Sequence, residues 1–294
     1  MGDFMQGLVT NYDLHTHSTA SDGVYTPAEL VARAASAGIK VLALTDHDTT
    51  AGLAEAEAAA RETGIRLISG VEISTTWQHK TLHVVGLNID AEHALLQAGL
   101  QQLDAIRTER ASEMGRRLEK AGIPGILEAA EALAGKGMLT RTHFAHCIAS
   151  LGLAVDVRDV FNRYLTAGKP GYVSTRWADL DTAIAWIRAA GGVAVLAHPQ
   201  RYQLTGSWLR RLLGEFREMG GAGLEVLSGT ATPGDVQSST ALALRFNLLA
   251  SCGSDFHGPD EGWPKLGRLP ALPAGLNPVW HAFENPGTAT RDAQ

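Results

Sequence analysis

Short apolar runs alternate with stretches of helical periodicity over the first 90 residues of the chain. The segment Thr26-Pro27-Ala28-Glu29 places a capping residue, a proline and an acid at the first positions of a helix, which we predict to end at Gly38. A second, Ala-rich helix is predicted over residues 50–63. Strands are predicted over 40–45, up to Glu72, and through 83–87. Strands that alternate with helices are typical of βαβ units around a parallel sheet or barrel.

The pattern changes in the middle of the chain. Residues 93–157 are predicted to be mostly helical, and the first strand-like run after them is Tyr172-Val173. The alternation then resumes, with helices predicted over 181–190, 208–220 and 238–246 and strands that end at His198, Leu227 and Cys252. We therefore predict one barrel over residues 8–270, interrupted by a helical insertion at 91–175 and followed by an extended C-terminal segment and tail at 271–294.

Ionisable residues gather where the predicted strands end. His15 and His17 lie on one face of an extended segment, about 7 Å apart, so both imidazoles can reach one cation. Similar residues follow the later apolar runs, and such groups at the C-terminal ends of buried parallel strands indicate an active site at a barrel mouth. The candidate metal ligands are His15, His17, Asp22, His47, Glu72, His83, His198, Asp255 and His257.

This set is larger than one ion can use, so two or three bridged divalent ions are expected, with Glu72 as the natural bridge. Mixed imidazole and carboxylate ligands suit Mn, Fe or Zn, whereas Mg prefers oxygen. A single histidine at a strand end is more often a hydrogen-bonded structural residue, and Asp48 alone could simply cap the helix that follows it. Recurrence at several separate strands favours the metal interpretation, with Asp46 and Asp48 as candidates to orient the imidazoles.

Composition excludes several functional classes. The net charge is −6, with 31 acidic against 25 basic residues, and no sustained basic run offers a footprint for long duplex nucleic acid. No apolar run approaches the roughly 20 residues that span a bilayer, and the first residues lack a signal-peptide pattern. Cys147 and Cys252 lie far apart and outside any metal-ligand spacing, which fits a reducing compartment. We expect a cytoplasmic protein.

Five short motifs together resemble the PHP (polymerase and histidinol phosphatase) family of the amidohydrolase superfamily, over about residues 10–260. They are Asp13-Leu14-His15-Thr16-His17, Thr45-Asp46-His47-Asp48, Gly70-Val71-Glu72, Ala197-His198-Pro199 and Gly253-Ser254-Asp255-Phe256-His257. The resemblance implies a distorted (βα)7 TIM-like barrel with a trinuclear metal centre. It assigns His15, His17, Glu72 and Asp255 to the first ion, Asp22, His47 and His257 to the second, and Glu72, His83 and His198 to the third.

Within the family, the insertion and Arg141-Thr142-His143 most resemble the nucleoside 3′,5′-bisphosphate phosphatases, a subgroup that includes enzymes trimming short RNA from the 5′ end. The pattern usual there is Arg-Pro-His, and this chain has Thr142 in place of the proline. A substrate with two phosphates needs a second anion site beside the metals. The planar fork of arginine suits that role, because it binds phosphate oxygens in pairs.

Several basic residues are candidates for this second site. Arg107 and Arg110 are three apart on a predicted helix and so share a face, while Arg141 and His143 alternate in an expected extended or turn segment. The alternative is a solvated helix face, to which we assign Arg116, Arg117, Arg210 and Arg211. The substrate-binding candidates are Asp22, His47, Arg107, Arg110, Arg141, His143, Lys169 and Tyr172.

The leading hypothesis is a metal-dependent phosphomonoesterase that removes the 3′-phosphate from nucleoside 3′,5′-bisphosphates, such as adenosine 3′,5′-bisphosphate. A hydroxide between the ions would attack phosphorus in line with the ribose 3′ oxygen. Glu72 and Asp255 are the expected catalytic metal ligands, and His143 is a candidate to protonate the leaving oxygen. The alternatives are 5′-to-3′ exonuclease action on short 5′-phosphorylated RNA, a histidinol phosphate phosphatase, and a metal-stabilised regulatory domain. The expected partner is a nucleotide or short oligonucleotide, without membrane contact.

Overall fold

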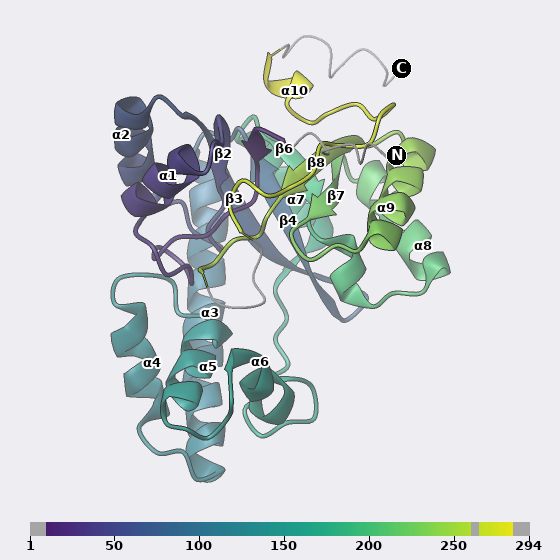
Figure 1. The fold of residues 1–294 in the computed structure, drawn as a ribbon. Coiled ribbons are helices and arrows are strands. Elements are labelled where there is room, and N and C mark those ends of the chain that lie inside the picture. The colour runs from purple at the N-terminus through teal and green to yellow at the C-terminus, as the bar shows by residue number, and fades with distance from the viewer. Residues whose placement is uncertain (1–9, 260–264, 285–294) are drawn as a thin grey trace, which may run out of the picture.

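Seven strands form a nearly closed barrel in the computed structural model, which describes residues 10–259 and 265–284 (Figure 1). Their order in space is β1 (Tyr12–Asp13), β2 (Val41–Leu44), β3 (Arg66–Trp77), β4 (Lys80–Leu87), β6 (Val193–Leu196), β7 (Gly223–Ser228) and β8 (Leu249–Gly253). β1 meets β8 where the Leu14 N–H donates to the Cys252 carbonyl and Thr16 pairs with Phe256. A short strand, β5 (Ala178–Asp179), pairs with β3 outside this order. The expected distorted barrel is confirmed.

β4 runs antiparallel to both of its neighbours, β3 and β6, which corrects the expectation of parallel strands throughout. β3 does not end at Glu72 but continues to Trp77. Gln78 and His79 then reverse the chain with positive φ angles of 46° and 65°, as is typical of a tight hairpin turn. Because β4 is reversed, His83 near its start lies at the same edge of the barrel as the C-terminal ends of the parallel strands.

Helices cover the two sides of the barrel in pairs. α1 (Pro27–Ser36) and α2 (Leu53–Thr63) lie beside β2, and α8 (Gly206–Glu218) and α9 (Pro233–Phe246) lie beside β7 and β8 (Figure 1). α1 has the predicted capping box, in which Thr26 and Glu29 bond to each other's backbone N–H groups. α2 begins three residues later than predicted, and α7 (Leu180–Ala189) packs through Ile184 and Ile187 in the main barrel core.

The middle of the chain forms a helical layer beneath the barrel (Figure 1). It contains α3 (Ala94–Lys120), α4 (Ile126–Ala134), α5 (Arg141–Ser150), α6 (Val157–Val160) and a π-helical turn over Phe161–Leu165. α3 belongs to both layers: Leu96, Leu100 and Leu103 pack in the barrel core, whereas Met114 and Leu118 pack in a separate core with α4 and α5. A helix of this length spans about 40 Å, which is enough to connect the two layers.

Two local predictions in this layer are wrong. Tyr172-Val173 is irregular and not a strand, and Arg141-Thr142-His143 is the first turn of α5 and not an extended segment. Thr140 caps that helix and accepts a hydrogen bond from the backbone N–H of Thr142. Threonine is a preferred N-cap residue, so the sequence did contain a sign that a helix begins here.

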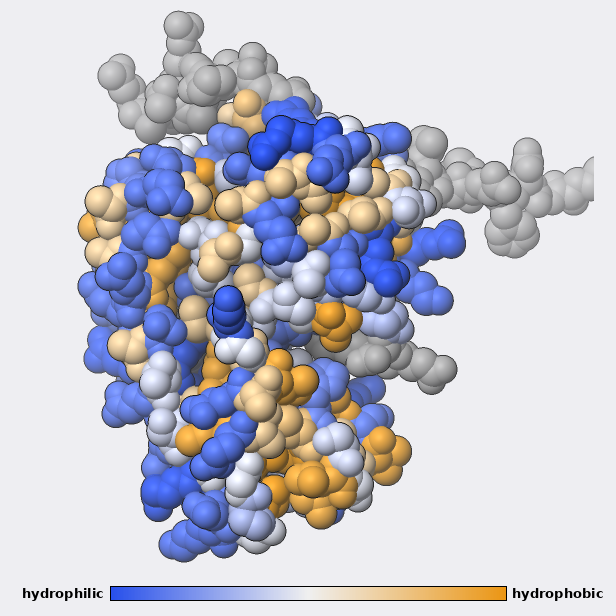
Figure 2. Space-filling view, turned by 90° about the vertical axis from the view of Figure 1, so that its left-hand side faces the viewer, coloured by the Kyte–Doolittle hydropathy of each residue, from blue (hydrophilic) through white to orange (hydrophobic). Residues whose placement is uncertain are grey.

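Apolar side chains gather on the helical layer in the face shown in Figure 2, where the barrel above is mostly polar. Exposed large hydrophobic residues on this layer include Leu133, Leu151 and Val155. Among the described helices, none is long and apolar enough to cross a membrane. The C-terminal segment packs back on the barrel, where Trp280 stacks on Tyr12 with ring centroids 4.0 Å apart, and ends in α10 (His281–Glu284). The expected tail beyond it lies outside the described residues.

Candidate metal centre and phosphate pocket

All nine predicted metal ligands meet at one end of the barrel. Three groups of their ligand atoms lie within 4.8 Å of one another, and they overlap through shared members. The groups are His15, His17, Glu72 and Asp255; His17, Asp22, His47 and His257; and His47, Glu72 and His83. His198 joins the cluster through its Nε2, which lies 3.0 Å from Glu72 Oε1. The backbone of His198 and Asp255 is left-handed (φ 27° and 54°), so local strain helps to direct these side chains inward.

Glu72 lies at the centre of the cluster and uses both carboxylate oxygens. Oε1 lies 2.9 Å from His83 Nδ1, and Oε2 lies 2.8 Å from His47 Nδ1 and 3.4 Å from His17 Nε2. The side chain is fully buried, because β3 carries it across the middle of the barrel mouth. A buried carboxylate with imidazoles on both oxygens has the geometry expected of a bridge between cations.

The other two carboxylates each present one oxygen to the imidazoles. Asp255 Oδ1 lies 3.1 Å from His17 Nε2, while Oδ2 accepts a hydrogen bond from Arg201. Asp22 Oδ1 lies 3.2 Å from His257 Nε2, while Oδ2 accepts a hydrogen bond from the Thr140 hydroxyl at 2.9 Å. The outer oxygen of each carboxylate is therefore held by a neighbouring residue, and the inner oxygen faces the cluster.

The donor set fits divalent transition-metal ions. Within the described parts of the chain, His15 Nε2, His47 Nδ1 and Glu72 Oε2 are buried and have no hydrogen-bond partner of good geometry, although His47 Nδ1 and Glu72 Oε2 are only 2.8 Å apart. Buried polar atoms without partners are rare in proteins and call for an explanation such as an ion. Lone pairs of nitrogen and oxygen directed at common points provide one, and the mixed donor set agrees with Mn, Fe or Zn.

Without ions, the cluster balances its charge with protons. Burial opposes ionisation, yet the imidazoles of His83, His47 and His15 hold the pKa of Glu72 well below its usual range. Burial likewise opposes protonation of His257, but the carboxylates of Asp22 and Asp255 raise its pKa to about 9. Burial and the neighbouring His257 lower the pKa of His17 to about 3. Metal binding would therefore displace protons from part of the cluster.

Two residues that the sequence motifs did not indicate, Glu225 and Gly253, support these ligands. Glu225, buried on β7, accepts a hydrogen bond from the His198 N–H at 2.6 Å and lies 3.4 Å from His15 Nδ1. Gly253 on β8 allows the His15 backbone to approach, since a Cβ there would lie 2.2 Å from His15 Cβ. The sequence offered one sign of the role of Glu225, which is its position inside the apolar run Leu224-Glu225-Val226-Leu227. A charged residue in a buried strand needs a partner.

Asp48 and Asp46 do not contact the imidazoles as expected. The Asp48 carboxylate accepts hydrogen bonds from the Ser74 N–H at 2.6 Å and from Arg107 Nε at 2.7 Å, and it does not cap α2, whose first residue follows Gly52. Asp46 instead accepts hydrogen bonds from Ser18 and Ser21, which hold the segment before Asp22. Asp48 thus anchors Arg107 beside the metal cluster.

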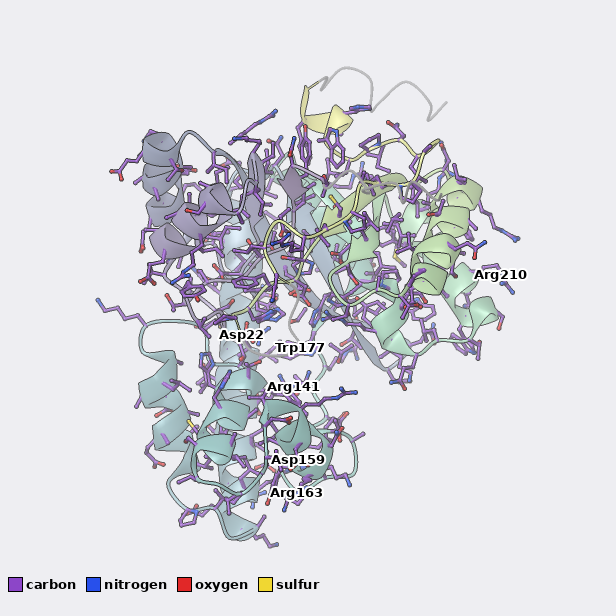
Figure 3. The ribbon with its side chains drawn as sticks, viewed as in Figure 1. Asp22, Arg141, Asp159, Arg163, Trp177 and Arg210 are labelled. Carbon is purple, nitrogen blue, oxygen red and sulfur yellow. The ribbon has the colours of Figure 1, made fainter. Side chains whose placement is uncertain are left out.

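A cavity of about 260 Å³ opens beside the cluster, between the barrel and α5. Asp22, His47 and His83 line its barrel side, and Arg110 and Arg141 line its insertion side. Figure 3 shows Asp22 and Trp177 at the lower rim of the barrel, directly above Arg141. Arg107, Tyr172, Phe161 and Trp177 complete much of the wall.

This cavity concentrates positive charge. Burial is the main reason that the pKa of Arg110 lies well below its usual range, and the positive charges of Arg141 and Arg107 lower it further. Burial also lowers the pKa of Arg141, with a smaller contribution from Arg107. Arg110 Nε is buried and has no hydrogen-bond partner among the described residues. The guanidinium groups of Arg107 and Arg110 lie 5.0 and 5.3 Å from the Trp177 ring centroid, and Arg141 lies 5.5 Å from that of Phe161. An anion between them would relieve their mutual repulsion.

Two predicted substrate contacts do not line this cavity in the part of the chain that is described. Lys169 is exposed outside it. His143 is buried at the start of α5, where its Nδ1 accepts a hydrogen bond from the Thr140 N–H at 3.1 Å, and burial lowers its pKa. A larger groove, about 890 Å³, lies between α2 and α3, but its described lining includes Glu57, Asp90 and Asp104 and no histidine. Of these two cavities, the smaller one brings arginines beside the histidine cluster.

The chain is similar over nearly its whole length to several known proteins. The 5′-3′ exoribonuclease of Haemophilus influenzae is 49% identical to this chain over 276 residues, covering 94% of this chain and all of that protein. The 3′,5′-nucleoside bisphosphate phosphatase of Chromobacterium violaceum is 47% identical over 277 residues, covering 94% and 97%. A solved amidohydrolase from Chromobacterium violaceum, with bound sulfate and no metal, superposes with a TM-score of 0.90 at 46% identity, covering 94% and 96% of the two chains.

The family model described as the PHP domain matches residues 13–184, more than half of the chain. That range includes six of the nine clustered ligands and the whole helical layer, and relatives of nearly full length extend the likeness to the remaining three. The protein belongs to the PHP domain family and is a hydrolase of the metal-dependent phosphoesterase type.

Proposed function

We propose that the protein removes the 3′-phosphate from nucleoside 3′,5′-bisphosphates, with the 3′-phosphate at the histidine cluster and the 5′-phosphate between Arg110 and Arg141. The observation that carries this proposal is the arrangement of the two sites. One cavity has buried imidazoles and carboxylates on one wall and, on the other, Arg110 and Arg141, which form no ion pair with a carboxylate of the described residues. Such a cavity suits a molecule with a phosphate at each end.

Two or three divalent ions bound to the nine clustered residues would lower the pKa of water and neutralise charge on the phosphoryl oxygens. Glu72 would bridge them, because both of its oxygens already face imidazoles. Asp22 and Asp255 would each contribute one oxygen, because Thr140 and Arg201 hold the other. Manganese is the ion we expect first, with iron or zinc as alternatives.

The insertion side would orient the substrate. Arg107 is fixed by Asp48 and by the Ser74 hydroxyl at 2.9 Å, so it supplies a rigid positive charge between the two ends of the cavity. Arg110 and Arg141, which are in no ion pair with the described carboxylates, would bind the 5′-phosphate, with Tyr172 beside them. His143 has a lowered pKa and its Nδ1 is occupied in capping α5, so we assign it to support of this wall instead of transfer of a proton.

A second activity on the same site is 5′-to-3′ exonuclease action on short 5′-phosphorylated RNA. The same contacts with a 5′-phosphate would bring the next phosphodiester to the metal cluster, and a relative that matches 94% of this chain is named a 5′-3′ exoribonuclease. Histidinol phosphate is disfavoured, because its ammonium group would meet three arginines in this cavity.

A hydrolysis screen with added Mn would test the proposal, with released phosphate as the readout for the monoesters and released nucleoside 5′-monophosphate as the readout for the pentanucleotides. Adenosine 3′,5′-bisphosphate and a 5′-phosphorylated pentanucleotide should be used far better than adenosine 3′-monophosphate, histidinol phosphate or the pentanucleotide without its 5′-phosphate. Equal hydrolysis of the substrates with and without the 5′-phosphate would refute the proposed role of Arg110 and Arg141. Absence of both products, phosphate and nucleoside 5′-monophosphate, in protein shown to bind Mn would refute the assignment as a phosphatase or exonuclease.

A further inference from the structure

The segment that carries Asp22 is held from two sides. On the barrel side, the Ser21 hydroxyl donates to Asp46 at 2.6 Å. On the insertion side, the Met138 N–H donates to the Ala20 carbonyl at 2.8 Å. The position of Asp22 at the metal cluster therefore depends on the docking of the helical layer against the barrel.

Gly137 makes this docking close. A Cβ at position 137 would lie 2.2 Å from the Thr19 carbonyl oxygen and 3.3 Å from that of Ser21. These are backbone atoms that cannot move aside as the tip of a flexible side chain would. Only glycine allows the loop before α5 to touch the loop before Asp22, so a side chain here would push the two layers apart.

Thr140 joins this docked loop directly to the metal cluster. Its hydroxyl donates to Asp22 Oδ2 at 2.9 Å and accepts from the Thr142 N–H at 3.1 Å as the cap of α5. The side chain is buried, so the bond is not exchanged with solvent. We propose that Thr140 is a positioning residue for Asp22, and that through it α5 sets the metal affinity of the site formed by His17, Asp22, His47 and His257.

A consequence follows from the neighbour of Thr140 in the sequence. Arg141 begins α5 and lines the phosphate cavity. An anion bound at Arg141 holds the first turn of α5 in place, and with it the bond from Thr140 to Asp22. Occupation of the phosphate pocket should therefore tighten metal binding at this site, and by linkage the metal should tighten the binding of the anion by the same factor. This coupling rests on the proposed function, whereas the role of Thr140 in metal binding does not.

The test is Mn²⁺ binding to the full chain after removal of metal with a chelator, measured by calorimetry or by competition with a chelating dye. Thr140→Val should weaken one class of sites by about 10- to 100-fold, the usual cost of losing a residue that supports a ligand. Thr140→Ser keeps the hydroxyl and should bind Mn²⁺ as the wild type does. Asp156→Ala, which removes the cap of α6 in the same layer, should lower thermal stability without changing Mn²⁺ affinity.

A second variant keeps the test decisive if Thr140→Val does not fold. Gly137→Ala changes none of the ligands and not Thr140, but it should separate the two loops and so weaken the same class of sites. Wild-type Mn²⁺ affinity and stoichiometry in Thr140→Val, or in Gly137→Ala where the first variant is insoluble, would overturn the proposal.

Adenosine 5′-monophosphate tests the coupling separately. It should raise the Mn²⁺ affinity of one class of sites in the wild type by about fivefold or more, and this gain should disappear in Thr140→Val. No gain in the wild type would overturn the coupling. If the wild type binds Mn²⁺ and loses affinity on Thr140→Val but releases no phosphate from any nucleotide, the proposed function fails and the role of Thr140 stands.

Discussion

Replacing Arg141 with alanine should impair the use of a bisphosphate far more than the use of a simple ester. Arg141 is half-buried on the cavity wall, and its nearest charged neighbours include Arg107 and Arg110. A charge-assisted hydrogen bond from such a group to phosphate contributes about 1.5–3 kcal/mol. Loss of one such bond corresponds to a decrease of about 10- to 150-fold in kcat/KM for adenosine 3′,5′-bisphosphate.

The assay compares two substrates and two variants. 4-Nitrophenyl phosphate has no second phosphate, so its hydrolysis by Arg141→Ala should change by less than about threefold if binding at the 5′ end is the only loss. Arg210→Ala is the matched control, since Arg210 is exposed on α8 on the far side of the barrel (Figure 3). It should leave the kinetics on both substrates unchanged. Equal losses on both substrates in Arg141→Ala would refute the reasoning and move Arg141 to the metal centre or the fold.

A stability measurement provides a second readout on the same variant. Arg141 and Arg110 repel each other in a partly buried site, and this repulsion helps to depress the pKa of Arg110. Without phosphate, Arg141→Ala should therefore melt at the same temperature as the wild type or slightly above it. Added phosphate should raise the melting temperature of the wild type more than that of the variant. A large loss of stability without phosphate would show that Arg141 serves the fold.

The remaining predictions concern the metal cluster. Elemental analysis of protein purified without chelators should show at least two equivalents of Mn, Fe or Zn, and one or fewer after reconstitution would contradict a bridged centre. Glu72→Gln should abolish phosphate release and retain the circular dichroism spectrum, because it removes a bridging charge and no core contact. Glu225→Gln should weaken metal binding by about 10- to 100-fold in chelator competition. His257 has an ordinary pKa of 6.5 that is raised to about 9 without metal. Its proton should therefore stabilise the metal-free protein fully below pH 6.5, and the melting temperature should fall as pH rises through 9, less so in His257→Asn.

The clustering of the candidate metal ligands could be predicted because most of them lie in short motifs next to apolar runs. The spacing of His15 and His17 identifies a shared face, and the ends of parallel strands bring distant motifs to one edge. The direction of β4 could not be predicted in this way. A helix between two strands indicates that they run parallel, and no helix separates β4 from β3. The turn at Gln78 and His79 lacks the glycine that normally marks a hairpin.

Supporting residues were harder to find than ligands. Arg201 and Thr140 act through the outer oxygens of Asp255 and Asp22, and nothing in their own local sequence shows which distant carboxylate they meet. The same holds for Asp48, whose partner Arg107 comes from α3. The contacts of Thr140 and Arg107 depend on how the helical layer docks on the barrel, and that of Arg201 depends on the packing of the segments that follow β6 and β8. Lys169, by contrast, was chosen from local sequence and lies outside the cavity.

The interruption of the barrel by the helical layer also bears on the order of folding. β4 pairs with β6, with Val84 opposite Leu196. This pairing can form only after the long stretch of chain between the two strands has become compact. The contacts of α4, α5 and α6 are local and form quickly, whereas barrel pairing across a long loop is slow. α3 has one end in each core. If the helices fold first, α3 therefore brings β4 and β6 closer together and reduces the length of flexible chain between them. Substitutions at Met114 or Leu118 should accordingly slow closure of a barrel that neither residue touches.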